Sequence, residues 1–180
     1  MRILGVDPGT RRCGYGVLDV EGMELRYVEC GVIEPPAKAP LAARLGELAV
    51  SLREVIVELR PGEVAVEEVF HGVDASAALR LGHARGVILA VAGEAGLPVV
   101  GYPPAKIKKA VTGRGAAGKP QVAGVVRSLL GLRRTPAPDA ADALAAAICH
   151  AFHRSLAARI GRATGGADKV AGASPAGRAR

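Results

Sequence analysis

The order of the apolar segments constrains the fold of this chain most strongly. Three β-rich runs come first, and two more alternate with helical segments further along the chain. Such an order predicts an α/β fold with a mixed five-stranded sheet flanked by helices. The five predicted strands are residues 2–7, 12–20, 24–34, 63–70 and 99–102.

Helical periodicity is clearest between the third and fourth strands. Apolar residues recur at steps of three and four from Leu41 to Leu59, and Arg60-Pro61-Gly62 ends the pattern. Gly and Pro residues separate the other helical segments. The further predicted helices are residues 74–95, a short one after Pro104, 120–130 and 139–160.

The length of 180 residues predicts one domain, which we place at residues 1–160. Residues 161–180 are rich in Gly, Ala, Ser and Pro and carry mostly basic charges, so we predict a disordered basic tail there.

Composition excludes several classes of protein. No apolar run reaches the roughly 18–20 residues that span a bilayer, and an acid interrupts the short apolar stretch at the N-terminus, unlike a signal peptide. Cys13, Cys30 and Cys149 show no metal-type spacing, which is typical of reduced thiols. We therefore expect a cytoplasmic protein with no membrane contact and no zinc site.

Four widely separated carboxylates stand where apolar elements begin or end. Asp7 ends the first strand, Glu67 or Glu68 lies in the fourth, and Asp139 and Asp142 open the last helix. Acids gathered in one pocket repel each other unless a cation joins them. Their hard oxygen ligands favour Mg²⁺ or Mn²⁺.

Each acid also has a purely structural interpretation. Asp139 could cap the last helix, and Asp7 could form an Asx-type turn with Pro8-Gly9. Asp142, however, lies within an alanine-rich apolar run, where a buried acid needs a reason. Adjacent strand residues point to opposite faces, so the pattern does not choose between Glu67 and Glu68.

The rest of the chain is basic, with a net charge of +7. No acid occurs between Glu94 and Asp139, which predicts a phosphate-binding surface, although a solvated basic face would look the same. The cations of this stretch are Lys106, Lys108, Lys109, Arg114, Lys119, Arg127, Arg133 and Arg134.

An acidic metal site in a basic protein suggests a phosphodiester substrate. If the four acids converge, they can hold two divalent ions roughly 3.5–4 Å apart, which would activate water and stabilise the leaving 3′ oxygen. No Ser-His-Asp or Cys-His arrangement is apparent, and we expect His150 and His153 to be packing or surface residues.

Five sequence blocks, in this order, resemble those of the bacterial crossover junction endodeoxyribonuclease RuvC family. The resemblance covers about residues 1–155. The blocks are Ile3-Leu4-Gly5-Val6-Asp7-Pro8-Gly9-Thr10, Gly14-Tyr15-Gly16, Ala65-Val66-Glu67-Glu68-Val69-Phe70, Ala77-Ala78-Leu79-Arg80-Leu81-Gly82-His83-Ala84-Arg85-Gly86 and Asp139-Ala140-Ala141-Asp142-Ala143-Leu144-Ala145.

The resemblance implies a ribonuclease H-like fold, a homodimer, Mg²⁺ or Mn²⁺ dependence and resolution of four-way (Holliday) DNA junctions in recombination and repair. It also implies a nucleoid-associated enzyme that works with the RuvA–RuvB branch-migration complex. Its metal-binding acids match Asp7, Glu67, Asp139 and Asp142, so the resemblance selects Glu67 over Glu68.

Three further positions carry a role by resemblance. Lys108 and Lys119 match basic residues near the scissile phosphate or DNA backbone, and Phe70 matches an aromatic that contacts bases at the junction centre. On this basis we expect Lys106, Lys109 and Arg114 to join the DNA-binding surface. This chain departs from many relatives at Asp74, His83 and Pro120, which puts sequence preference and loop geometry in question.

Three rival functions remain at this point. Asp7-Pro8-Gly9-Thr10 also resembles the phosphate-binding turn of actin-like and sugar-kinase ATPases, although no second phosphate motif is present. A ribonuclease H-like nuclease could act on RNA or RNA–DNA hybrids instead. A DNA-binding module without activity would explain the basic stretch but not four acids at element ends.

Overall fold

A mixed sheet of five strands organises the molecule. The computed structural model describes residues 1–68 and 75–165, with side chains described up to residue 160. The strand order is β3-β2-β1-β4-β5, with β2 antiparallel to both β1 and β3, and β4 parallel to both β1 and β5. The predicted mixed sheet is confirmed. The strands are β1 (Arg2–Asp7), β2 (Cys13–Glu21), β3 (Glu24–Ile33), β4 (Glu63–Glu67) and β5 (Val99–Tyr102).

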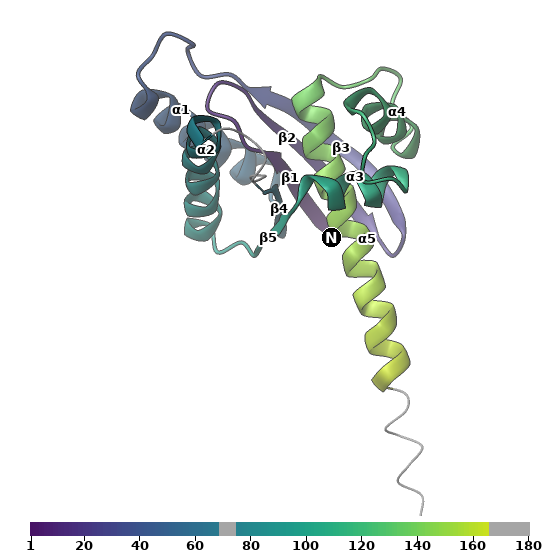
Figure 1. The fold of residues 1–180 in the computed structure, drawn as a ribbon. Coiled ribbons are helices and arrows are strands. Elements are labelled where there is room, and N and C mark those ends of the chain that lie inside the picture. Colours follow the sequence, from purple (N-terminus) through teal and green to yellow (C-terminus); the bar gives the residue numbers. More distant parts are fainter. Residues whose placement is uncertain (69–74, 166–180) are drawn as a thin grey trace, which may run out of the picture.

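Helices cover both faces of this sheet. Helix α5 crosses one face together with α3 and α4, whereas α1 and α2 lie side by side on the other (Figure 1). The helices are α1 (Leu41–Leu59), α2 (Ala75–Glu94), α3 (Pro104–Thr112), α4 (Lys119–Leu129) and α5 (Pro138–Gly165).

Strand β1 contributes to both hydrophobic layers. Leu4 and Val6 are fully buried in the core under α1 and α2, and Ile3 is fully buried in the core under α5. Burying one such side chain contributes about 1.5–3 kcal/mol. Because successive side chains alternate between faces, Asp7 falls on the same face as Ile3, beneath α5.

Helix α5 approaches the sheet closely because glycines face an alanine-rich helix. A Cβ atom at Gly5 would lie 2.0 Å from the carbonyl oxygen of Ala143, and one at Gly14 would lie 1.9 Å from that of Asp139. Gly14 pairs with Asp7 across β1 and β2. The close approach therefore brings the first turn of α5 to the end of β1.

Some predicted boundaries differ from the structure. Strand β4 ends at Glu67, and residues 69 and 70 of the predicted strand lie outside the described residues. Helix α4 begins at Lys119, because the Gln121 side chain accepts a hydrogen bond from the Gly118 N–H at 3.1 Å and caps this end. Helix α5 runs to Gly165, beyond its predicted end at residue 160.

Other predictions lie outside the described residues. They concern Phe70, the departure at Asp74 and the tail from residue 166 onward. Within the described part of the chain, no helix is long and apolar enough to cross a membrane.

Candidate active site

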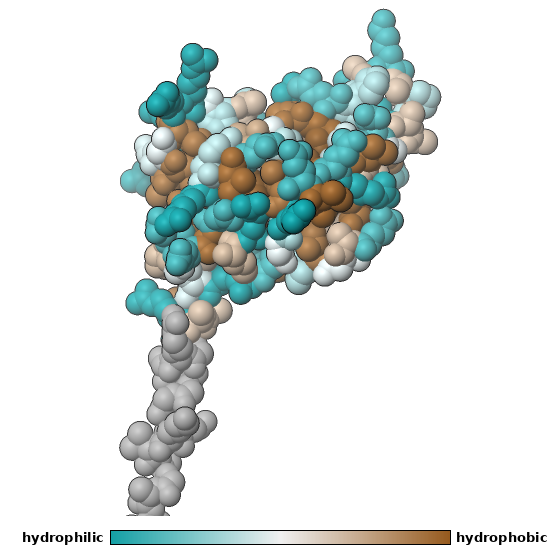
Figure 2. All heavy atoms as spheres, turned by 180° about the vertical axis from the view of Figure 1, so that it is seen from behind, coloured by the Kyte–Doolittle hydropathy of each residue, from teal (hydrophilic) through white to brown (hydrophobic). Residues whose placement is uncertain are grey.

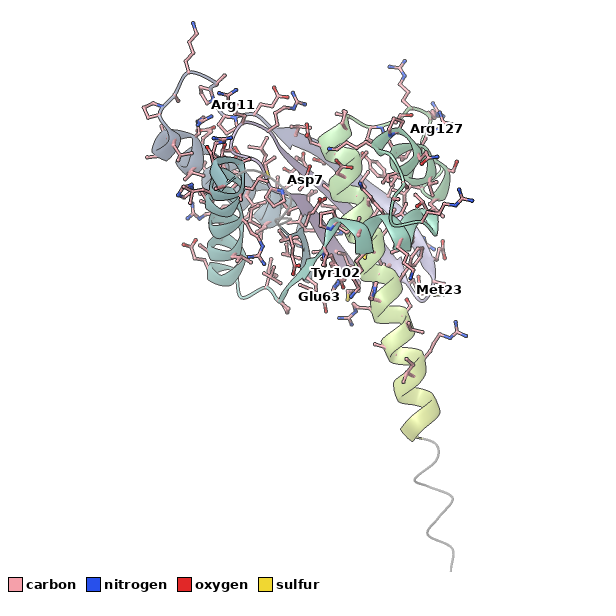
Figure 3. All side chains as sticks on the ribbon, viewed as in Figure 1. Asp7, Arg11, Met23, Glu63, Tyr102 and Arg127 are labelled. Carbon is pink, nitrogen blue, oxygen red and sulfur yellow. The ribbon has the colours of Figure 1, made fainter. Side chains whose placement is uncertain are left out.

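Two parallel strands bring the first two carboxylates together. Val6 of β1 pairs with Val66 of β4, so the next residues, Asp7 and Glu67, lie side by side where both strands end. Both strands are buried in the centre of the sheet, which fixes their backbone positions. Figure 3 labels Asp7 near the middle of the molecule, beside α5.

The electrostatics of this pair reveal negative charge that is not fully compensated. Burial and the nearby carboxylates of Glu67 and Asp142 together raise the pKa of Asp7 to about 8, although the charge of Lys119 lowers it. Burial also raises the pKa of Glu67 to about 7, with Asp142 adding to it and Lys119 and Lys108 opposing. A cation placed here would relieve this repulsion.

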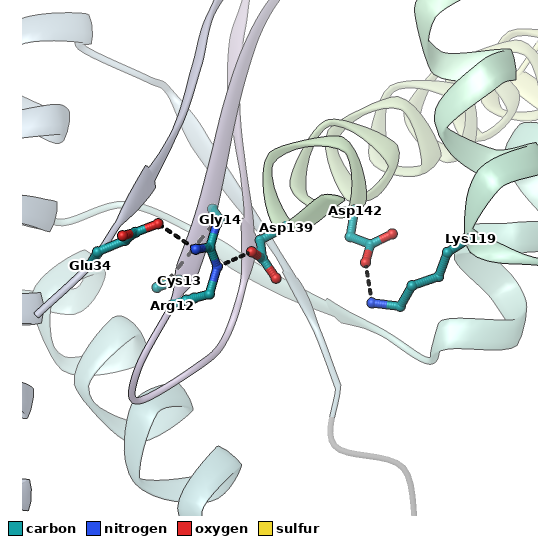
Figure 4. A network of polar contacts seen from close by, with 7 residues as sticks. All are labelled: Arg12, Cys13, Gly14, Glu34, Lys119, Asp139 and Asp142. Atoms are coloured by element: carbon teal, nitrogen blue, oxygen red, sulfur yellow. Dashed lines mark hydrogen bonds and ion pairs between the residues drawn. The ribbon is translucent and has the colours of Figure 1, made fainter. Parts of the chain in front are cut away.

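The N-terminal end of α5 supplies the other two carboxylates. Asp139 and Asp142 stand three residues apart and share one side of the helix. Each is paired with a cation in Figure 4: Asp139 Oδ2 lies 2.7 Å from Nε of Arg12, and Asp142 Oδ2 lies 2.8 Å from Nζ of Lys119. Asp139 therefore forms an ion pair with Arg12 in addition to its place at the start of the helix.

In the structure, the side chains of Glu67 and Glu68 lie on opposite faces of the sheet. The N–H of Glu68 donates to the carbonyl oxygen of Tyr102 at 2.9 Å. Its side chain lies beside Gly101, with Oε1 2.5 Å from where a Cβ would be. Tyr102 packs in the α5 layer, so the neighbouring Gly101 faces the other side of the sheet. Glu67, and not Glu68, faces the other acids.

A divalent cation fits the chemistry of this donor set. Four carboxylates, two of them held on rigid strands with raised pKa values, supply the hard oxygens that Mg²⁺ and Mn²⁺ prefer. In the described residues, no three His, Cys, Asp or Glu side chains are already arranged to hold an ion. Asp139 and Asp142 each give one carboxylate oxygen, Oδ2, to a protein cation, Arg12 and Lys119 respectively.

The basic residues predicted at the site separate into two groups. Lys119 and Lys108 lie close enough to lower the pKa of Glu67, as expected of residues beside the acids. Lys106 instead places its ammonium 5.2 Å from the ring centroid of Tyr102. Lys109 and Arg114 are exposed on or just after α3.

Two residues of the site escaped prediction. Arg12, in the loop after β1, bridges Asp139 and Glu34, and the Arg12–Glu34 distance is 2.6 Å. The available signal was a pair of arginines, Arg11 and Arg12, close behind Asp7 in a loop. Glu34 follows β3, and nothing in its sequence context indicated a link to the last helix.

A second polar cluster lies away from the acids. His150 of α5 is buried, with Nδ1 2.8 Å from the Tyr102 hydroxyl and Nε2 2.6 Å from Glu63 Oε2, while Arg154 also pairs with Glu63. Burial alone would raise the pKa of Glu63, but the hydrogen bonds from His150 and Arg154 lower it overall. Figure 3 shows Glu63 and Tyr102 together, apart from Asp7. This cluster joins α5 to β4 and β5, as expected for a packing histidine.

The sheet order and the meeting of strand and helix acids define a nuclease of the ribonuclease H-like class. The chain belongs to the family described as crossover junction endodeoxyribonuclease RuvC, whose model matches residues 3–150. The recognition from sequence blocks is thus confirmed, and the chain is an endodeoxyribonuclease. Divalent-metal dependence follows from this membership.

Proteins of this family are similar to the chain, in sequence and in structure, over most of its length. A crossover junction endodeoxyribonuclease RuvC from Halorhodospira halophila is 55% identical over 154 residues, covering 86% of this chain and 92% of that protein. The structure of T. thermophilus RuvC in complex with Holliday junction substrate superposes with a TM-score of 0.81 and 39% identity, covering 87% of this chain and 96% of the other.

A more distant structure supports the fold alone. The yeast mitochondrial Holliday junction resolvase matches with a TM-score of 0.60 at 14% identity, covering 86% of this chain and 79% of that one. The predicted ribonuclease H-like fold is confirmed by these superpositions.

Proposed function

We propose that this chain resolves four-way DNA junctions by hydrolysing one phosphodiester bond in each of two strands. The acids Asp7, Glu67, Asp139 and Asp142 hold two divalent ions, Mg²⁺ or Mn²⁺, in each site. The observation that carries the proposal is the meeting of two strand acids with two acids at the N-terminal end of α5. The likeness to a RuvC structure with junction substrate supports the choice of DNA.

The acids and lysines have distinct roles in this chemistry. Bound divalent ions supply the Lewis acidity that makes hydroxide available near neutral pH and stabilises the leaving 3′ oxygen. Asp7 and Glu67 provide oxygens on a rigid sheet, so the geometry is set before substrate arrives. Lys119 and Lys108 place positive charge where a phosphate would approach, and Lys119, with a side chain 68% exposed, can exchange Asp142 for a phosphate oxygen.

Water is the nucleophile in this proposal. Cys13 and Cys149 are unsuited to attack a phosphodiester, because burial raises the pKa of Cys13 to about 12 and that of Cys149 to about 11. His150 already uses both ring nitrogens in its contacts with Tyr102 and Glu63. Hydrolysis at a metal site needs neither residue as a nucleophile.

The DNA-binding surface follows α3, α4 and the loop between them. Exposed Lys106, Lys109 and Arg114 extend the positive charge of Lys108 and Lys119 away from the acids. We assign the base-contacting role at the junction centre to Phe70 on the family resemblance alone. A cytoplasmic, nucleoid-associated location and the RuvA–RuvB branch-migration complex as partner belong to the same proposal, with residues 1–160 as the nuclease domain.

A homodimer would present two such sites to the two-fold symmetry of a four-way junction. Helix α2 buries Ala84 and Ile88 against its own sheet, yet leaves Leu79 64% exposed. Helix α1 leaves Val57 73% exposed, and hydrophobic residues gather in patches on the face seen in Figure 2. We propose that apolar residues on the outer side of α1 and α2 contribute to the dimer interface.

Cleavage of matched nucleic acid substrates tests this function. Four-way junctions with varied central sequences, linear duplex and an RNA–DNA hybrid are incubated with the protein and Mg²⁺ or Mn²⁺. Paired nicks in symmetric strands of the junctions alone are the expected result. Cutting of the hybrid alone would indicate a ribonuclease, and binding without cutting under every condition would indicate a DNA-binding module.

A further inference from the structure

Arg12 links three elements at the edge of the acidic site. Its guanidinium lies 2.7 Å from Asp139 Oδ2, through Nε, and 2.6 Å from Glu34 Oε1, through Nη1 (Figure 4). Asp139 belongs to the first turn of α5, and Glu34 directly follows β3. One cation is thus shared between a site carboxylate and a carboxylate outside the four-acid set.

We propose that Arg12 is a positioning residue that competes with the divalent ion for Asp139, and that Glu34 sets the strength of this competition. The inference rests on the proposed metal site. While Arg12 is paired with Asp139, the charge of one of the four carboxylates is balanced by a cation of the protein itself. Metal binding through Oδ2 of Asp139 therefore requires the Arg12–Asp139 pair to separate.

The exposure of the pair fixes the expected size of the effect. The Arg12 side chain is 48% exposed and that of Asp139 is 24% exposed, so solvent screens much of their attraction. The attraction within so exposed a pair is small, and we expect it to change the equilibrium constant of metal binding by no more than about fivefold. Removing the Arg12 charge should therefore tighten metal binding by up to about fivefold.

Substitution of Glu34 should change metal affinity in the opposite direction from substitution of Arg12. Because Arg12 divides its hydrogen bonds between two carboxylates, loss of Glu34 leaves the guanidinium to Asp139 alone. The substitution Glu34→Gln should then weaken metal binding, by roughly threefold on the same scale. In a chain that lacks the Arg12 charge, Glu34→Gln should have little further effect, since its action passes through Arg12.

DNA should relieve the competition. A backbone phosphate offers the exposed guanidinium a bidentate partner that can replace Asp139. Junction DNA would then free Asp139, so DNA and metal bind cooperatively and each tightens the other by the same factor. Loss of the Arg12 charge should reduce this coupling, because Asp139 is then already free.

Direct titration with Mn²⁺ tests the inference without any readout of activity. Free Mn²⁺ is measured by electron paramagnetic resonance for the wild type, Arg12→Gln, Glu34→Gln and the double variant, first without DNA and then with a four-way junction. The matched control is Arg53→Gln, because Arg53 is 49% exposed and pairs with Glu94 at 3.0 Å between α1 and α2. We expect tighter binding for Arg12→Gln, weaker binding for Glu34→Gln and no change for the control.

A further variant separates failure of this inference from failure of the metal site. Asp7→Asn should abolish high-affinity Mn²⁺ binding; if it does not, the proposed site itself is wrong. If Asp7→Asn abolishes binding while Arg12→Gln binds Mn²⁺ like the wild type, only the role of Arg12 is wrong. Should Arg12→Gln fail to fold, unchanged affinity in Glu34→Gln would overturn the inference by itself.

Discussion

The ammonium of Lys119 lies 2.8 Å from Oδ2 of Asp142, joining the first residue of α4 to the N-terminal end of α5. The hydrogen bond to Asp142 raises the pKa of Lys119, which is therefore a firmly charged group beside the acids. Lys119→Gln should reduce junction cleavage by about 10²-fold, as for loss of one charge-stabilising group.

The same substitution should also change binding. Junction affinity should fall, and its dependence on the logarithm of the salt concentration should become shallower by about one phosphate contact. Arg53→Gln, outside the basic stretch, is the control for general loss of positive charge. Equal effects of both substitutions would show that Lys119 acts only through net charge.

Stability without metal should fall as pH rises. In the unfolded chain Asp7 and Glu67 titrate near their ordinary values of 3.8 and 4.5, whereas in the folded chain their pKa values are about 8 and 7. Between these values the folded state binds more protons, so the free energy of unfolding decreases from about pH 4.5 to pH 8. Thermal unfolding at pH 5.5 and 8.5, in the presence of a chelator, measures the effect.

Asp7→Asn isolates the contribution of the most shifted acid to this slope. At pH 8 the free energy of unfolding of the variant should exceed that of the wild type by on the order of a few kcal/mol. Below pH 4 the two proteins should be about equally stable. Adding Mg²⁺ should recover the stability of the wild type at high pH but not increase that of the variant. A wild type whose stability rises steadily from pH 5.5 to 8.5 would contradict the electrostatic account of the site.

The close approach of α5 to β1 should tolerate no side chain at Gly5. In Gly5→Ala, the new Cβ would lie 2.0 Å from the Ala143 carbonyl oxygen, so the helix must move. We expect a loss of about 1–3 kcal/mol from overpacking, with cleavage impaired because α5 positions Asp139 and Asp142. Denaturant unfolding and cleavage rates measure both effects.

Gly46→Ala is the matched control. Gly46 lies in α1 with no atom within 4 Å of an added Cβ. This substitution should stabilise the chain by about 0.5–1 kcal/mol through helix propensity, with no effect on cleavage. Equal tolerance at both positions would contradict the packing described here.

The buried cluster around His150 should act on stability more than on chemistry. Because Glu63 accepts from Nε2 of His150, Nδ1 is left to accept the hydrogen bond of the Tyr102 hydroxyl. Tyr102→Phe should cost about 1–3 kcal/mol by leaving that nitrogen without its partner. In Tyr27→Phe, where the residue is 39% exposed, a change within about 0.5 kcal/mol is expected. Urea unfolding of the two variants compares these values, and equal losses would contradict the role of the buried contact.

The local hydrophobic pattern of the sequence correctly predicted the elements that have one apolar face or are short apolar runs. The bounds of β1, α1 and β5 agree with prediction, because Leu41–Leu59 keeps one apolar face and the other two are short apolar runs ended by Pro8-Gly9 and Pro103-Pro104. Helix α5 extends further than predicted, since Gly161 lowers helix propensity without ending the helix.

The tertiary partners of the acids could not be predicted from local pattern. Period-two alternation places Glu67 and Glu68 on opposite faces but does not say which face α5 covers. The pairing of Arg12 with Asp139 spans 127 residues, and that of Glu63 with His150 spans 87. Such contacts depend on sheet order and helix placement, which the family blocks implied but no single segment contains.

The most direct test of the central claim compares five neutralising substitutions on one four-way junction. Asp7→Asn, Glu67→Gln, Asp139→Asn and Asp142→Asn remove the four proposed ligands, and Glu68→Gln changes the adjacent acid on the opposite face of the sheet. With Mg²⁺ or Mn²⁺, the first four should lose cleavage by roughly 10³-fold or more while still binding the junction, and Glu68→Gln should cut like the wild type. Normal cleavage by Asp7→Asn, or equal losses in Glu67→Gln and Glu68→Gln, would contradict a site built from these four carboxylates.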